Sequence, residues 1–254
     1  DHALIERVLH NLVGNAVRYC NAGGVIRLAA KEWERAGEAP GVEITVQNSG
    51  PHIPEEVRAN NAAGWKATFG EVDEVASVED VDANGVPARI YRPTERKDGD
   101  EPATALVYFH GGGWVAGSVE VYDPLTRAIA KRANTVVVSV DYRLAPEHRY
   151  PAALDDAWTA TRWVSDNAAD LGVDPMKIGV GGDSAGGTLA AVVARKARDF
   201  GLAIATQLLI YPVMSHDFNT PSYSLFSDGY LLTREAMIWY WKQYVGEVDA
   251  STDA

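Results

Sequence analysis

The segment GVGGDSAGGTLAAVVA (residues 179–194) surrounds Ser184 with the residue types that a nucleophilic serine requires. A nucleophile elbow holds its side chain at a strained turn between a strand and a helix, so the positions two before and two after it must lack bulk. Those positions are Gly182 and Gly186. The N–H groups and the dipole at the start of the following helix favour negative charge that develops beside the serine. The segment therefore predicts a serine nucleophile, although the bare pattern also occurs by chance.

A second glycine-rich segment, VYFHGGGWVAGS (residues 107–118), begins at the end of an apolar run. Three consecutive glycines let backbone N–H groups turn toward one point without interference from side chains, as an oxyanion hole requires. The two segments together are much more specific than either one alone. They indicate a serine nucleophile that works beside an oxyanion hole.

The elements that must position these segments alternate in character from about residue 57 onward. Near-continuous apolar runs are typical of parallel strands buried on both faces, and the helical stretches between them suit right-handed crossovers. The four runs are TALVYF (104–109), NTVVVSVDY (134–142), KIGVGG (177–182) and QLLIYPV (207–213). The sequence therefore predicts an open, mostly parallel α/β sheet with helices on both faces.

The first 57 residues have a different pattern. Apolar side chains recur at three- and four-residue spacings over residues 1–20, which predicts an amphipathic helix. The segments GGVIRLAA (23–30) and GVEITVQNSG (41–50) predict two strands. We therefore expect a small α+β fragment at residues 1–57 that precedes an α/β domain at residues 58–254.

Residues from about 57 to 254 resemble the hormone-sensitive-lipase-like family of α/β-hydrolase esterases. The segments that carry this resemblance are HGGGW (110–114), DYRLAPEHRYPAALDD (141–156) and GDSAGG (182–187), in this order. The resemblance implies a carboxylic ester hydrolase that cleaves short- to medium-chain acyl esters of small molecules, with Ser184 as nucleophile and without a metal or other cofactor. It also implies an oxyanion hole made by the N–H groups of Gly112, Gly113 and Ala185, a loop shaped by His110 and Gly111, and an elbow supported by Gly182, Asp183 and Gly186.

The same resemblance assigns a structural role to the middle segment, where Arg143, Glu147 and His148 are expected in a polar network. Three aromatic residues are candidates for the wall of an acyl or alcohol pocket, and core packing explains them equally well. They are Trp65, Phe69 and Trp114.

The group that would take the proton of Ser184 is not evident. In α/β-hydrolases the triad carboxylate and histidine follow the serine in that order. The resemblance places both beyond residue 254, so we expect a truncated chain with an incomplete sheet and strongly reduced activity. His216 is the only histidine after Ser184 and the one candidate for a substitute base, although a structural role is the favoured interpretation of its loop, which includes Asp217. The alternative function is a non-catalytic binding module or a chimeric remnant with a sensor-kinase fragment.

The amino-terminal residues resemble a different family. The segments RVLHNLVGNAVRY (7–19) and VQNSGPHIPEE (46–56) resemble the first half of the ATP-binding domain of sensor histidine kinases. The resemblance implies that Asn15 would help to bind Mg²⁺ and that Asn48 stands where many relatives carry an aspartate that recognises adenine. Only half of such a site is present, so we expect no nucleotide binding and interpret the join as a chimera or a misassembled reading frame.

Composition excludes other classes of function. The 254 residues include 35 acidic and 23 basic ones, a formal charge of −12, and no cluster of basic residues, which argues against nucleic acid as a partner. No apolar run approaches the ~20 residues of a membrane span, and the lone Cys20 cannot form an internal disulfide, so we expect a cytoplasmic protein. QLLIYPV is expected to form an exposed sheet edge that favours self-association.

Overall fold

A computed structural model of the chain contains two compact units, Asp1–Ala59 and Asn60–Ala254, which we describe separately. The structure describes residues 26–33, 41–48, 58, 72–95, 97, 99–227 and 232–246.

The first unit contains an antiparallel hairpin. Its strands are β1 (Ile26–Trp33) and β2 (Gly41–Asn48), paired from Ile26 opposite Asn48 to Trp33 opposite Gly41. The two strands predicted for this part of the sequence are thereby confirmed. The helix predicted over residues 1–20 lies outside the described residues.

The second unit is built on a sheet with the strand order β3-β4-β6-β5-β7-β8. The four predicted apolar runs form its parallel strands β5, β6, β7 and β8, and β3 and β4 form an antiparallel hairpin beside β6. The strands are β3 (Ser77–Asp82), β4 (Pro87–Arg92), β5 (Ala103–Phe109), β6 (Val136–Val140), β7 (Val173–Asp183) and β8 (Thr206–Ile210). The mostly parallel sheet predicted from the sequence is confirmed.

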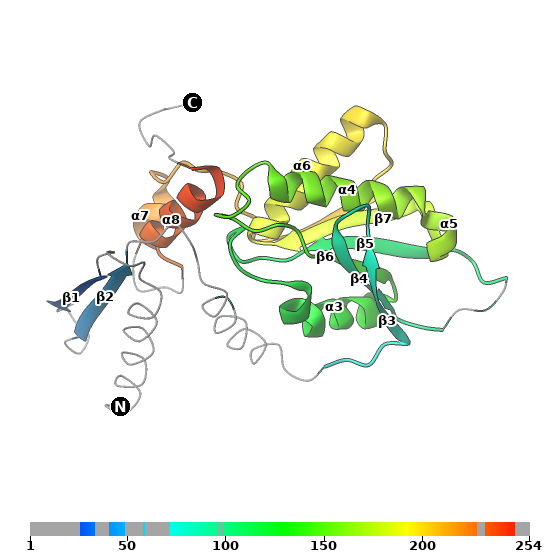
Figure 1. Ribbon diagram of the computed structural model, residues 1–254, viewed down its shortest axis with the longest axis horizontal. Coiled ribbons are helices and arrows are strands. Elements are labelled where there is room, and N and C mark those ends of the chain that lie inside the picture. Colours follow the sequence, from blue (N-terminus) through cyan, green and yellow to red (C-terminus); the bar gives the residue numbers. More distant parts are fainter. Residues whose placement is uncertain are drawn as a thin grey trace. The chain divides into compact units, whose positions relative to one another are not determined.

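Helices cover both faces of this sheet, with α3 on one face and α4 and α6 on the other (Figure 1). All five residues of β6 are buried, because a strand in the middle of a sheet that is covered on both sides has no face toward water. The helices are α3 (Val119–Ala133), α4 (Ala152–Asp166), α5 (Ala168–Leu171), α6 (Ala185–Phe200), α7 (Pro221–Leu225) and α8 (Arg234–Val245).

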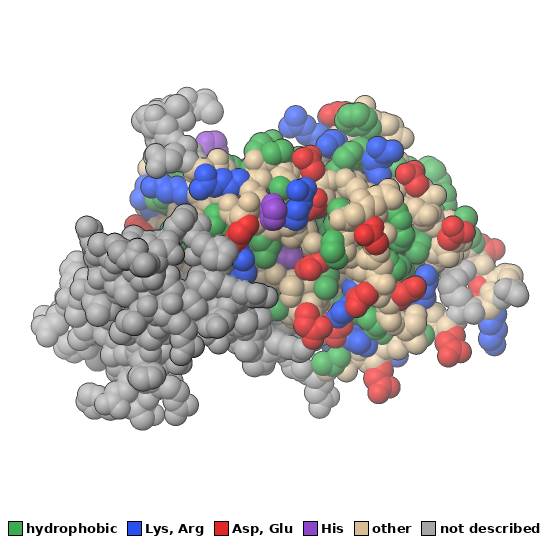
Figure 2. Space-filling model, in the orientation of Figure 1, with side chains coloured by type: hydrophobic (Ala, Val, Ile, Leu, Met, Phe, Trp, Pro, Cys, Tyr) green, Lys and Arg blue, Asp and Glu red, His purple; other side chains and the backbone are tan. Residues whose placement is uncertain are grey.

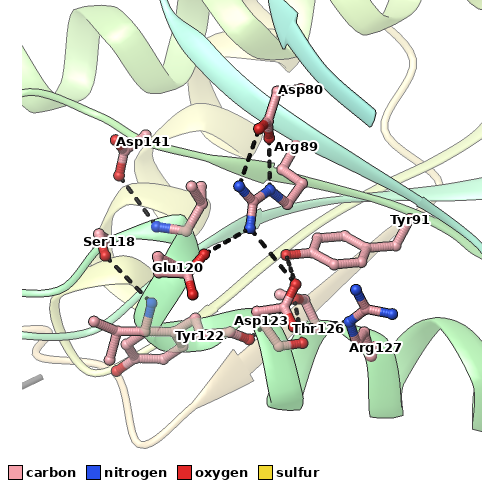
Figure 3. Close-up of polar contacts among 12 residues, drawn as sticks. Asp80, Arg89, Tyr91, Ser118, Glu120, Tyr122, Asp123, Thr126, Arg127 and Asp141 are labelled. Atoms are coloured by element: carbon pink, nitrogen blue, oxygen red, sulfur yellow. Dashed lines mark hydrogen bonds and ion pairs between the residues drawn. The ribbon is translucent and has the colours of Figure 1, made fainter. Parts of the chain in front are cut away.

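The start of α3 is fixed by two side chains. The Ser118 hydroxyl accepts a hydrogen bond from the backbone N–H of Val121 at 3.3 Å, as an N-cap residue does. The Asp141 carboxylate, just after β6, accepts a hydrogen bond from the Val119 N–H at 3.1 Å. These two hydrogen bonds hold the first turn of α3 beside the end of β6 (Figure 3).

Arg89 of β4 ties the β3–β4 hairpin to the same helix (Figure 3). Its guanidinium binds Asp80 of β3 and lies 3.0 Å from Glu120 and 3.6 Å from Asp123, both on α3. The hydrogen bond from Arg89 lowers the pKa of Asp80. Tyr91 of β4 also contacts α3, because its hydroxyl donates a hydrogen bond to the Asp123 carboxylate at 3.0 Å.

Strand β8 forms one edge of the sheet in the described part of the chain, as predicted for QLLIYPV. Leu208 and Leu209 are 38% and 37% exposed there. Figure 2 shows acidic side chains spread over the described part of one face of the molecule and not gathered in one place. Within the residues described, no helix combines the length and the apolar character needed to cross a bilayer.

Candidate active site

Ser184 lies at a sharp turn between a strand and a helix. Strand β7 ends at Asp183 and α6 begins at Ala185, and Ser184 between them has φ 52° and ψ −119°. A non-glycine residue at positive φ is strained, and such strain is a property of nucleophile elbows. The Ser184 backbone is held there because its N–H donates a hydrogen bond to the Ile210 carbonyl of β8 at 2.9 Å.

The glycines on either side of this turn have a steric reason. A Cβ atom at Gly182 would lie 2.4 Å from the carbonyl oxygen of Phe109, and one at Gly186 would lie 1.9 Å from the same oxygen. It would also lie 2.5 Å from the carbonyl oxygen of His110. The end of β5 therefore lies directly against the first turn of α6, which brings the predicted oxyanion loop to the serine turn.

The glycine loop itself is held by close packing. Gly112 has φ 115°, and a Cβ atom there would lie 2.1 Å from the carbonyl oxygen of Ala116. A Cβ atom at Gly113 would lie 2.1 Å from the ring of Tyr240, on α8. Helix α8 therefore packs against the part of the loop whose N–H groups are predicted to bind an oxyanion.

The buried Asp183 carboxylate joins the loop to the serine turn. Its Oδ1 accepts hydrogen bonds from the Tyr108 hydroxyl at 2.9 Å and from the Gly111 N–H at 3.0 Å, and its Oδ2 accepts one from the Tyr122 hydroxyl at 2.9 Å. Burial, and then the nearby charge of Asp183, raise the pKa of both tyrosines, so they remain donors. Tyr108 and Tyr122 were not predicted from the sequence; the only signal for them is a tyrosine two residues before HGGG.

His110 is completely buried and stacks on the ring of Tyr142 at 4.3 Å between centroids. Its Nδ1 lies 2.7 Å from the Gly111 carbonyl oxygen, which can only accept, so Nδ1 carries the proton. Its Nε2 has no hydrogen-bond partner within the part of the chain that the structure describes. This geometry suits a residue that shapes the loop.

The buried His110 makes stability depend on pH. Burial lowers the pKa of its imidazole below 6.5, so its neutral form stabilises the fold above that pH, and the unfolded chain gains protons as the pH falls below it. We expect the free energy of unfolding to fall by up to about 1.4 kcal/mol per pH unit below 6.5 from this residue. Urea denaturation at pH 7.5 and 5.5 measures this slope. His110→Gln should flatten this slope; a slope equal to that of the wild type would contradict the assignment.

His216 lies in the exposed loop after β8, where its ring centroid is 5.9 Å from that of Trp241. Among the described residues, no side chain, that of His216 included, forms a hydrogen bond with the Ser184 hydroxyl. Asp217 accepts a hydrogen bond from the Asn219 N–H at 2.9 Å, which is a local turn contact.

The remaining residues singled out in the sequence lie in ion pairs, on the surface, in the core or outside the described residues. The Arg143 guanidinium binds Asp156, with Nη2 2.7 Å from Oδ1, and Glu147 and His148 are exposed. Trp114 is fully buried and stacks on Tyr244 of α8 at 4.3 Å, which favours the core-packing interpretation. Asn15, Trp65 and Phe69 lie outside the described residues, as does the side chain of Asn48. In the described ranges, no group of three or more His, Cys, Asp and Glu side chains could hold a metal ion.

The second unit is similar to known esterases. Carboxylesterase NlhH of Mycobacterium tuberculosis is 47% identical over 167 residues, which cover 65% of this chain and 51% of the relative. An ethyl acetate hydrolase of Pseudomonas putida is 39% identical over 69% of this chain and 57% of its own length. The solved structure of a hyperthermophilic esterase of the archaeon Pyrobaculum calidifontis matches with a TM-score of 0.68 and 42% identity, over 76% of this chain and 64% of that one. The chain spans about half the length of the first curated relatives it matches.

Two family descriptions match different parts of the sequence. Residues 1–95 match the histidine kinase-, DNA gyrase B- and HSP90-like ATPases, which confirms the resemblance of the amino-terminal residues, although β3 and β4 within that range lie in the six-stranded sheet. Residues 106–254 match the family described as alpha/beta hydrolase fold. With the esterase relatives, this match confirms the resemblance to the hormone-sensitive-lipase-like esterases. The chain belongs to the alpha/beta hydrolase fold family.

Proposed function

We propose that this chain carries the acyl-serine part of a carboxylic ester hydrolase, with Ser184 as nucleophile. The observation that carries the proposal is the strained backbone of Ser184 at the junction of β7 and α6. The glycine loop, bonded to the neighbouring Asp183 through Gly111, supports it. The N–H groups of Gly112, Gly113 and Ala185 are the proposed oxyanion hole.

The chemistry is acyl transfer in two steps. The Ser184 hydroxyl oxygen attacks the ester carbonyl carbon, its proton passes to solvent water or hydroxide, and the carbonyl electron pair moves onto oxygen, where backbone N–H donors stabilise the charge. The pair then re-forms the carbonyl, the carbon–oxygen bond to the alcohol breaks, and the alcohol leaves with a proton. Water releases the acid from the acyl-serine by the same steps.

The proposed substrates are small esters with short- to medium-chain acyl groups. The name of the Pseudomonas putida relative says that it hydrolyses ethyl acetate, an ester of this size. We further infer that this chain hydrolyses esters slowly, since within the described residues no imidazole forms a hydrogen bond with the Ser184 hydroxyl. Loss of the base in a serine hydrolase costs roughly a millionfold in kcat.

A boronic acid tests the proposal without a need for fast turnover. Boron accepts the oxygen of an active-site serine, whose proton passes to solvent, and the tetrahedral adduct resembles the transition state of acyl transfer. We expect butylboronic acid to bind saturably and to give a tetrahedral boron signal by ¹¹B NMR. Only trigonal boron at saturating concentration would contradict the nucleophile assignment and favour the non-catalytic binding module.

His216→Ala tests the substitute base. We expect the hydrolysis of p-nitrophenyl butyrate to change by less than about twofold and to rise with hydroxide concentration from pH 6 to 9, because the exposed His216 forms no hydrogen bond with the Ser184 hydroxyl. The pH–rate profiles of both proteins measure this. A rate that levels off with rising pH in the wild type, and not in the variant, would identify His216 as the base.

The exposed edge of β8 supports self-association. A terminal strand leaves a row of backbone N–H and C=O groups unpaired, and the half-exposed Leu208 and Leu209 add apolar surface to it. We expect the apparent mass in size-exclusion chromatography to rise with protein concentration, and Leu209→Lys to suppress the rise. A monomer at every concentration would rule out this association.

A further inference from the structure

We propose that Asp183 is a positioning residue that holds the oxyanion loop in register with Ser184, and that Tyr122 of α3 sets its position. This inference rests on the proposed function, because it concerns the geometry of the same site. It assigns Asp183 and Tyr122 no contact with substrate.

The contacts of Asp183 come from three separate parts of the fold. Tyr108 lies in β5, Gly111 in the loop that follows it, and Tyr122 in the first turn of α3, and each places its donor 2.9 to 3.0 Å from a carboxylate oxygen. Asp183 as a whole is 5% exposed. A desolvated charge of this kind is stable only when hydrogen bonds satisfy it, so these three donors determine where the carboxylate lies.

The carboxylate in turn determines where the loop lies. A Cβ atom at Gly111 would lie 2.2 Å from Asp183 Oδ2 and 2.8 Å from the Tyr122 hydroxyl oxygen, so the first glycine of the loop packs directly on this pair. The next two residues, Gly112 and Gly113, supply N–H groups of the proposed hole. Since Ser184 is the next residue after Asp183, one side chain is bonded to the loop and adjoins the nucleophile.

Tyr122 is suited to act as the fixed point because the first turn of its helix is anchored. Ser118 caps this turn and Asp141 binds the Val119 N–H (Figure 3). Arg89 connects Glu120 of the same turn to the β3–β4 hairpin at 3.0 Å. The Tyr122 hydroxyl therefore transmits the position of a rigid helix to the Asp183 carboxylate. A displacement of about 1 Å at a catalytic group is enough to cost a hundredfold in rate.

Tyr122→Phe tests the proposal, because it removes the hydroxyl and keeps the ring. Tyr91→Phe is the matched control: Tyr91 is also buried, its hydroxyl also donates to an aspartate, and that aspartate, Asp123, is not bonded to the loop. We expect Tyr122→Phe to weaken the binding of butylboronic acid about tenfold, which is the effect of misplacing one hydrogen-bond donor to the charged adduct. Tyr91→Phe should change the affinity by less than about twofold. Thermal unfolding verifies that both variants are folded at the temperature of measurement.

A second pair of variants separates position from charge. Asp183→Asn keeps an acceptor for Gly111 and Tyr108 and can donate to the Tyr122 oxygen, so we expect it to retain boronate affinity within about threefold. Asp183→Ala removes every contact, and we expect a loss of about a hundredfold.

The outcomes distinguish this inference from the proposed function. Equal boronate affinities of Tyr122→Phe and Tyr91→Phe overturn the positioning role and leave Ser184 as nucleophile. Absence of a tetrahedral adduct in the wild-type chain overturns the proposed function, and the positioning role with it.

Discussion

Replacement of Ser184 by alanine is expected to abolish the tetrahedral adduct of butylboronic acid and to weaken its binding by at least ~100-fold. The bond between boron and the serine oxygen is what distinguishes a transition-state analogue from an ordinary ligand. Such analogues bind more tightly than substrates by roughly 10²-fold or more. The variant keeps the glycine loop and α6, so noncovalent contacts with the butyl group remain. Calorimetric titration of wild type and variant measures the difference, and ¹¹B NMR reports the geometry at boron.

Thr188 provides the control for this experiment. Its hydroxyl lies one helical turn after Ser184 and donates a hydrogen bond to the Val213 carbonyl at 2.6 Å, so it is engaged in structure. We expect Thr188→Ala to keep the adduct. If Ser184→Ala binds the boronic acid as tightly as the wild type does, the pocket holds its ligand without covalent chemistry, and the chain is a binding module.

The parallel strands could be predicted from the sequence, because a strand buried on both faces needs a short, continuous apolar run, and other elements seldom have one of that length. The runs that became β5, β6, β7 and β8 were predicted for that reason. The sequence was also sufficient for the two glycine segments, whose chemistry depends on residues close together in the chain. Gly182 and Gly186, for example, flank the same serine, and both pack so closely against the Phe109 carbonyl oxygen that a Cβ atom would clash with it.

The sequence was not sufficient for contacts between distant residues. Tyr108 and Tyr122 precede Asp183 by 75 and 61 residues, and a tyrosine in an apolar strand or on a helix has no local feature that identifies its hydroxyl as a donor. The position of Tyr240 behind Gly113 depends likewise on where α8 packs, which follows from the whole tertiary structure. Strand order was hidden for the same reason, since β6 pairs with β4 and β5 on its two sides.

Gly186→Ala is expected to reduce the free energy of unfolding by about 3 kcal/mol or more, although alanine is the better helix former by about 1 kcal/mol. The added methyl group would lie 1.9 Å and 2.5 Å from the carbonyl oxygens of Phe109 and His110, both of them backbone atoms that no rotamer change can move. Either β5 or α6 must shift, and β5 leads directly into the oxyanion loop. The variant should therefore also lose boronate binding.

Gly201→Ala, at the other end of the same helix, separates this steric effect from the general cost of replacing a glycine. Gly201 ends α6 with φ 72°, and a Cβ atom there would have no neighbour within 4 Å. Alanine at that position carries only the backbone strain of the left-handed region, about 1 kcal/mol, and should leave boronate binding intact. Urea denaturation of the three proteins measures both changes. Equal destabilisation by the two substitutions would show that α6 tolerates a methyl group beside β5, and that the elbow is less tightly packed against the loop than the contacts at Gly186 require.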